Sequence, residues 1–390
     1  MSSRRFLSLF EKMTSKRQTL LGVGPMSQRI VDETIGLANE LKKPIALIPS
    51  RRQIECRELG GGYVNNWDTS SFAKYVREKD VGEYVFLSRD HSGPWQFNEL
   101  DSFGNVLTHQ DAIKQAKLSL VTDINNGFDL LHIDPSPSLK FGLKESDVEH
   151  DIVELIDVCH KIKTNNPPLF EVGADEQSMT PDLPSLAGLK LERILDSLKS
   201  EGLPSPLFYV LQTGTKVKEL RNVGSFASYL PTQGMLSASF QIPEIIEVCN
   251  RYKVYLKEHN ADYLPDESLA WHRRFGIPAA NVAPEFGVSE TKALLSAARS
   301  NGQSWFVDDF SEHVVSKLKW KKWLVESSNA TLEDKVLIAG HYHFSDLEIV
   351  DSIAKLENNL LKRNFDLDFY IRSKLRNSLS RYLREFGYYE

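Results

Sequence analysis

Short apolar segments alternate with longer amphipathic segments along most of this chain. An apolar run bounded by turn-forming residues is typical of a buried strand, and apolar residues spaced three and four apart are typical of a helix. The predicted strands cover residues 19–24, 45–49, 84–91, 130–134, 169–173, 207–212, 254–259 and 277–282. Helical patterns lie between several of them, over residues 28–41, 111–125, 147–161, 191–200 and 243–250.

Strand–helix units in one long series predict a (β/α)₈ TIM barrel. A doubly wound sheet is the alternative, but it seldom runs to so many consecutive units. We expect the barrel over residues 18–300, after an N-terminal helix over residues 1–17. From Thr291 onward the pattern is helical, which predicts a helical C-terminal appendage over residues 301–390 that packs on the barrel or serves assembly.

Composition narrows the class of protein. The chain has 390 residues, of which 41% are hydrophobic and 26% charged, and a net charge of −6, as in ordinary globular proteins. The widely spaced Cys56, Cys159 and Cys249 support neither a disulfide framework nor a zinc knuckle. No apolar run is long enough to span a bilayer, and no basic stripe with interleaved aromatics indicates nucleic-acid binding.

The chain begins with a basic, mildly amphipathic segment that could be a targeting peptide. It lacks a long apolar centre and a small-residue cleavage site, and it contains Glu11, so a helix is the favoured interpretation. We therefore expect a cytoplasmic protein.

Several predicted strands end in groups that can ligate a metal or transfer a proton. These groups are Asp90, His91, His132, Asp134, Asp175, Glu176, Gln212, His259 and Asp262. A single histidine or aspartate after a strand is often a packing or helix-capping residue. In a barrel, however, the carboxyl ends of all strands meet at one face, and histidines with carboxylates suit Zn²⁺ or another divalent cation.

Cations also follow two predicted strands. Arg51 and Arg52 come after the second strand and Lys216 after the sixth, where they either grip a phosphate or carboxylate or lie solvated at the surface. The nearby run Gly60-Gly61-Gly62 matches no nucleotide-binding motif. The spacing of His341 and His343 could also bind a metal, although a structural role is favoured there.

The sequence resembles the Z-type subunit of class II D-tagatose-1,6-bisphosphate aldolase, often called the non-catalytic or accessory subunit. The shared motifs are GGY at 61–63, DHxGP at 90–94, HID at 132–134, Val172-Gly173 with a nearby acid, Gln212 with Gly214, HNADY at 259–263, and Pro284. The resemblance implies a barrel of the class II aldolase superfamily, whose catalytic members bind Zn²⁺ through histidines and use an adjacent aspartate as acid and base.

The resemblance assigns roles to individual residues. It makes His91 and His259 candidate metal ligands and Asp90 the candidate proton-transfer group. From their positions at or after strand ends, Asp175 and Gln212 are further candidate ligands, and Glu176 is a second candidate catalytic group. The candidate substrate-binding residues are Arg51, Arg52, Arg89, His132, Asp134, Lys216 and Asp262.

The chain also departs from the family pattern. Arg89 stands where the family commonly has glycine, and the fifth-strand Gly-Thr-Glu reads Gly-Ala-Asp-Glu at 173–176. The first strand lacks the family's Cys-Ser-Ala-His, having Gly-Pro-Met-Ser at 24–27. These departures indicate a divergent member.

Three functions are consistent with this pattern. The first is a metal-dependent enzyme, with Zn²⁺ as the expected cofactor, that acts on a ketose or ketose phosphate by aldol cleavage or C4 epimerisation. The second is a non-catalytic subunit that stabilises a separate catalytic aldolase, and the third is a sugar-binding scaffold. The expected partners are a sugar or sugar phosphate and either a second copy of the chain or a catalytic aldolase subunit.

Overall fold

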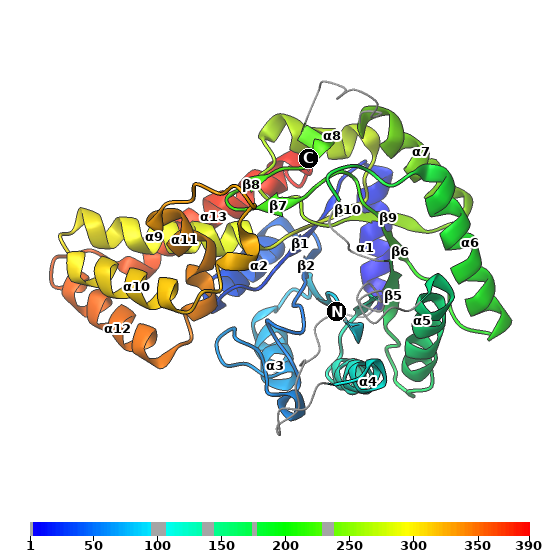
Figure 1. Ribbon diagram of the computed structural model, residues 1–390, viewed down its shortest axis with the longest axis horizontal. Coiled ribbons are helices and arrows are strands. Elements are labelled where there is room, and N and C mark those ends of the chain that lie inside the picture. Colours follow the sequence, from blue (N-terminus) through cyan, green and yellow to red (C-terminus); the bar gives the residue numbers. More distant parts are fainter. Residues whose placement is uncertain (1–2, 95–106, 135–143, 174–177, 228–237) are drawn as a thin grey trace.

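A closed barrel of parallel strands forms the centre of the molecule (Figure 1). The computed structural model describes residues 3–94, 107–134, 144–173, 178–227 and 238–390. The barrel strands are β1 (Leu20–Val23), β2 (Ile45–Leu47), β3 (Val85–Arg89), β4 (Leu130–Ile133), β5 (Leu169–Val172), β6 (Phe208–Val210), β9 (Tyr255–Glu258) and β10 (Ala279–Val282). They pair in this order, and β10 closes the ring on β1. The predicted (β/α)₈ barrel is confirmed.

A helix follows each barrel strand and covers its outer side. These helices are α2 (Gln28–Leu41), α3 (Thr69–Lys79), α4 (His109–Asn125), α5 (Glu145–His160), α6 (Pro184–Ser200), α7 (Ala238–Arg251), α8 (Asp266–Phe275) and α9 (Pro284–Ser300). Because one side of each strand faces the barrel interior and the other faces helices, the strands are buried on both sides and read as apolar runs. Helix α3 was absent from the sequence prediction, although a capping box of Asp68 and Ser71 marks its start.

Helix α1 (Ser3–Ser15) covers the amino-terminal end of the barrel. The Phe6 ring lies 4.0 Å from that of Phe86 in β3. The Phe10 ring lies 5.1 Å from Phe208 and 5.0 Å from Tyr255, the first residues of β6 and β9. The opposite end, where the strands terminate, is left as the mouth of the barrel.

The C-terminal region is helical, as predicted, and consists of α10 (Ser304–Ser316), α11 (Leu332–Ala339), α12 (Leu347–Leu361) and α13 (Leu367–Glu385). In Figure 1, α9–α12 gather at one side of the barrel, and α13 runs from that group back towards it. Helix α13 packs against α2, α8 and α9, so it belongs to the outer layer of the barrel. After it, the buried Tyr388 donates a hydrogen bond to Pro44 O and accepts one from Leu21 N.

Shorter elements connect these parts. They are the 3₁₀ helices η1 (Arg57–Leu59), η4 (Ser225–Ala227), η5 (Lys321–Trp323) and η6 (Gly340–His343), and the hairpin of β7 (Val217–Lys218) and β8 (Arg221–Asn222). In the described part of the chain, no helix combines the length and apolar character needed to cross a bilayer.

Candidate metal centre

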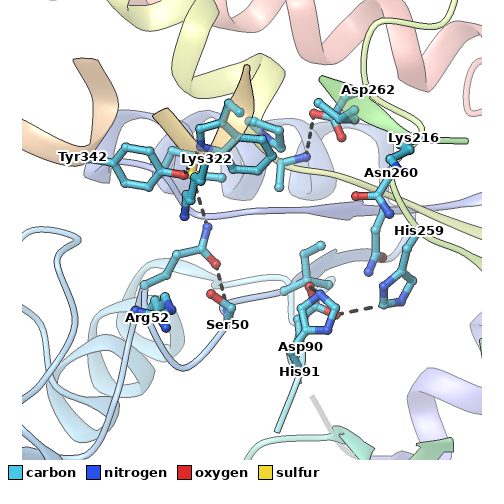
Figure 2. Close-up of a pocket in the computed structure, with 18 of the residues that line it drawn as sticks. Ser50, Arg52, Asp90, His91, Lys216, His259, Asn260, Asp262, Lys322 and Tyr342 are labelled. Carbon is cyan, nitrogen blue, oxygen red and sulfur yellow. Dashed lines mark hydrogen bonds and ion pairs between the residues drawn. The ribbon is translucent and has the colours of Figure 1, made fainter. Parts of the chain in front are cut away.

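Three histidines and one aspartate converge at the mouth of the barrel. His132 lies in β4, His259 directly follows β9, and Asp90 and His91 directly follow β3. One ligating atom of each lies within 4.8 Å of the others. Carboxylate oxygens of Asp90 lie 3.4 Å from His91 Nε2, 3.5 Å from His132 Nδ1 and 3.8 Å from His259 Nε2. Figure 2 shows Asp90, His91 and His259 at the base of the pocket.

The backbone after β3 allows two consecutive residues to serve one site. Side chains of adjacent residues point to opposite faces within a regular strand. Strand β3 ends at Arg89, and His91 adopts a left-handed conformation with φ of 50°. Two residues later, a Cβ on Gly93 would lie only 1.7 Å from the carbonyl oxygen of Asp134, so glycine allows this loop to approach β4 closely.

Hydrogen bonds orient the imidazoles. His91 Nδ1 lies 2.7 Å from Asp134 Oδ2, and His132 Nε2 lies 3.0 Å from Gly173 O. These contacts leave His91 Nε2 and His132 Nδ1 facing Asp90. Metal-binding histidines in proteins are commonly held in this way by a carboxylate or carbonyl at the other ring nitrogen.

A buried ion pair lies directly beneath the histidines. Lys257 Nζ is 2.5 Å from Glu171 Oε2, while Glu171 Oε1 is 3.0 Å from His259 Nε2. Burial alone would raise the pKa of Glu171, but the charges of Lys257 and His132 and the hydrogen bond from His259 lower it to about 2. Sequence analysis did not identify Glu171 or Lys257, although each interrupts an apolar strand, which was the available signal.

The environment of Asp90 indicates a cation-binding site. Burial opposes its ionisation, but the positive charges that His91, His259 and His132 carry when protonated hold its pKa far below the usual range. Its Oδ1 is nonetheless buried without a hydrogen-bond partner among the described residues. Three imidazoles and a buried carboxylate oxygen together form a donor set that fits Zn²⁺ or a similar divalent ion.

A cavity of about 460 Å³ opens above this cluster. Its wall contains the cations Arg52, Lys216, Lys218 and Lys322. Lys322 and Tyr342 come from the C-terminal region, so that region forms part of the wall of the site (Figure 2). Desolvation, together with the charges of Arg52 and Lys319, lowers the pKa of Lys322 to about 8.

Asn281 in β10 also lines this cavity, and sequence analysis missed it. Its side chain is 4% exposed, and neither Oδ1 nor Nδ2 has a hydrogen-bond partner among the described residues. An amide in this position can donate to and accept from a bound hydroxyl or carbonyl group.

The expected substrate-binding residues take several positions. Arg52, Lys216 and Asp262 line the mouth cavity. The carboxylate of Asp262 also accepts hydrogen bonds from Ala283 N and Glu285 N at the start of α9. The structure brings His132 into the histidine cluster and places Asp134 behind His91, although both were expected to contact substrate.

Two residues that were expected to contact substrate lie buried in ion pairs with neighbouring side chains. Arg89 is fully buried and forms a bidentate ion pair with Asp123 of α4, at 2.6 and 2.8 Å, because its side chain faces the helix layer. Arg51 is buried against Glu55 at 2.5 Å and lines a neighbouring cavity of about 490 Å³ instead.

Among the described residues, the expected ligand Gln212 does not join the cluster. Gln212 Oε1 accepts a hydrogen bond from Ser178 N, and Gln212 is not among the described residues that line the mouth cavity. Asp175 and Glu176 lie outside the described residues.

Comparison with protein-family models finds no match, and comparison with curated proteins finds no relative. Among solved structures, the chain is similar to one titled a probable tagatose 6 phosphate kinase from Sinorhizobium meliloti, with a TM-score of 0.74 and 13% identity over 94% of this chain and 100% of that one. It is also similar to the fructuronate-tagaturonate epimerase UxaE from Cohnella laeviribosi (TM-score 0.56, 13% identity, 95% and 82% covered).

A third similar structure is the fructose-bisphosphate aldolase of Campylobacter jejuni (TM-score 0.52, 10% identity, 94% and 96% covered). At these identities the likeness concerns the fold. The chain therefore shares its barrel fold with an aldolase and an epimerase, and its resemblance to the accessory-subunit family stays a prediction.

Proposed function

We propose that this protein is a metal-dependent enzyme that makes or breaks the C3–C4 bond of a ketose or ketose phosphate. The observation that carries the proposal is a buried oxygen of Asp90 that lies among three imidazoles at the floor of a cavity and has no hydrogen-bond partner among the described residues. That arrangement pairs a cation-binding donor set with a carboxylate that reaches the cavity.

His91, His132 and His259 would hold the ion. A divalent cation bound there would polarise the ketose carbonyl and stabilise the negative charge that develops on it. Glu171 orients His259 and, through its pair with Lys257, keeps a negative charge beneath the imidazoles. Asp134 contacts His91 at Nδ1 and leaves Nε2 facing Asp90, whereas Glu171 contacts His259 at Nε2 itself.

Asp90 would move the proton. Its carboxylate lines the cavity, where in its ionised form it would accept the proton of the C4 hydroxyl as the C3–C4 bond breaks and return it when the bond re-forms. Departure of the aldehyde gives aldol cleavage, whereas rotation and recombination give C4 epimerisation. The amide of Asn281 is placed to bind a hydroxyl group of the sugar.

Arg52, Lys216 and Lys322 would bind an anionic group on the substrate. These cations line the cavity from separate segments. Two carboxylates also line it, but Asp90 faces the histidines and Asp262 accepts hydrogen bonds at the start of α9. This excess of positive charge supports a sugar phosphate or a sugar acid over a neutral ketose.

The proposal is tested by assaying retro-aldol cleavage and epimerisation of ketoses and their phosphates with the protein loaded with Zn²⁺. Asp90→Asn should retain the fold and the metal but reduce turnover by roughly 10²–10⁴-fold, the usual contribution of acid–base help. His132→Ala should lose the metal. Asp196→Asn, at an exposed position on α6, is the matched control and should behave as wild type.

Two outcomes would contradict the proposal. Turnover that survives Asp90→Asn would remove this carboxylate from the mechanism. Absence of turnover together with stimulation of a separate catalytic aldolase, by wild type and Asp90→Asn alike, would instead establish the accessory-subunit function.

A further inference from the structure

A second cluster of metal-ligating side chains lies in the C-terminal region. His313 comes from α10, His343 ends η6, and Asp346 caps the start of α12. His313 Nε2 and His343 Nδ1 each lie 2.7 Å from the same oxygen, Asp346 Oδ2. One ligating atom of each residue therefore lies within 4.8 Å of the other two.

The surroundings of this cluster resemble those of a metal site. His313 Nδ1, the nitrogen that faces away from Asp346, lies 3.2 Å from Glu348 Oε2. A carboxylate at that position fixes the tautomer in which Nε2 carries the lone pair that a metal requires. The His343 side chain is 1% exposed and that of Asp346 36% exposed, so the cluster is anchored inside and open to solvent on one side.

The alternative is a hydrogen-bonded clamp in which Asp346 Oδ2 accepts a hydrogen bond from each imidazole. Tetrahedral Zn²⁺ holds nitrogen and oxygen ligands at 2.0–2.2 Å, so its ligand atoms are about 3.3 Å apart. The present 2.7 Å separations would have to open by about 0.6 Å, which small side-chain rotations allow. Lys319 lies close enough to lower the pKa of Asp346 and is the cation that competes with a metal.

We propose that His313, His343 and Asp346 form a second divalent-cation site, for Zn²⁺ or a chemically similar ion, with solvent completing the coordination. Two imidazoles and one carboxylate are a common ligand set for such ions. The ion would join α10 to the start of α12, and this site does not depend on the one at the barrel mouth.

The second site lies directly behind the wall of the mouth cavity. Tyr342, the neighbour of His343, lines that cavity, and its hydroxyl accepts a hydrogen bond of 3.1 Å from Trp323 Nε1. The Tyr342 ring also lies 5.1 Å from both the Tyr63 ring and Lys322 Nζ. An ion that fixes His343 would therefore also fix Tyr342 in the wall.

The test is the metal stoichiometry of the full chain. Protein stripped with a chelator is titrated with Zn²⁺ against a chromophoric chelator, and the Co²⁺ form is examined for visible d–d absorption. Wild type should bind two ions, and His313→Gln and Asp346→Asn one each. Asp346→Asn keeps a side-chain oxygen that can accept a hydrogen bond, so its fold is preserved, which circular dichroism verifies.

Controls separate the two sites. Asp308→Asn, exposed on α10, should still bind two ions. His259→Gln should retain the ion of the second site, and the double variant His259→Gln/Asp346→Asn should bind none. The rise in Tm that Zn²⁺ causes in His259→Gln should vanish in the double variant.

One result would exclude the second site, and another would exclude the metal site at the barrel mouth. If His313→Gln and Asp346→Asn bind as many ions as wild type, the second site does not exist and the cluster is a clamp. If instead one ion is lost in these variants but none in His259→Gln, the second site stands and the metal of the proposed function fails.

Discussion

Arg89 was expected at the substrate, and its burial leads to a sharp stability prediction. Its guanidinium contacts both oxygens of Asp123 and donates to Ile54 O at 2.6 Å and Pro49 O at 3.2 Å. Its CZ atom also lies 5.0 Å from the Phe128 ring centroid. Arg89→Met keeps an unbranched aliphatic stem but removes the guanidinium, so it leaves Asp123 as an uncompensated buried carboxylate.

Removing one partner of a buried ion pair costs roughly 3–5 kcal/mol of unfolding free energy. With an unfolding entropy of about 0.8 kcal/mol/K for a chain of this length, a loss of about 4 kcal/mol lowers Tm by about 5 °C. Burial already raises the pKa of Asp123, and without Arg89 it should rise further. A raised carboxyl pKa stabilises the protonated native form, and this stabilisation is lost as pH rises through that pKa. The free energy of unfolding that Arg89→Met removes should therefore be larger at pH 8 than at pH 5.

The assay is urea unfolding of wild type, Arg89→Met, Asp123→Leu and the double variant at both pH values. The double variant should recover part of the stability, because it removes both charges. Arg193→Met, an exposed arginine paired with Glu149, should change stability by less than about 1 kcal/mol. A stable Arg89→Met protein with weakened substrate binding would refute the reasoning and return Arg89 to the barrel mouth.

Other predictions follow from the packing and charges. Burial and the charge of Glu285 raise the pKa of Asp262 to about 8, so native stability should fall as pH increases towards 8, and Asp262→Asn should flatten that slope in urea midpoints at pH 5–8. Arg52→Ala and Lys322→Ala should raise KM for a phosphorylated ketose far more than for the neutral sugar, with Tm unchanged; equal effects would exclude an anion site. Phe10→Ala should cost about 3–5 kcal/mol in chemical denaturation, whereas Phe240→Ala, at an exposed position, should cost little.

The barrel was predictable because its strands are short, apolar and regularly separated. The pattern also placed Asp90, His91, His132 and His259 at strand ends, and strand ends meet in a barrel whichever segments they come from. Residues distant in the sequence could therefore be assigned to one end of the molecule before any side-chain geometry was known.

The positions of the remaining site residues could not be predicted, because the sequence does not show which side of a buried strand a residue faces or how the C-terminal helices pack. Arg89 and Lys257 both interrupt apolar strands, yet Arg89 faces the helices and Lys257 faces Glu171. In a strand buried on both sides, composition does not distinguish the two faces. Lys322 and Tyr342 reach the cavity through tertiary packing of the C-terminal helices, for which the sequence carried no local signal.

The hydrogen bonds of Tyr388 to β1 and to Pro44, just before β2, have a consequence for folding during synthesis. The hydrogen bond from Leu21 N to the Tyr388 hydroxyl joins residues 367 positions apart, and α13 fills its place beside α2 late in the chain. While the polypeptide leaves the ribosome, the first helix–strand unit has no permanent neighbour on one side. Since long-range closure slows folding, we expect the native barrel to form only after α13 and Tyr388 have emerged, with the nascent chain relying on chaperones until then.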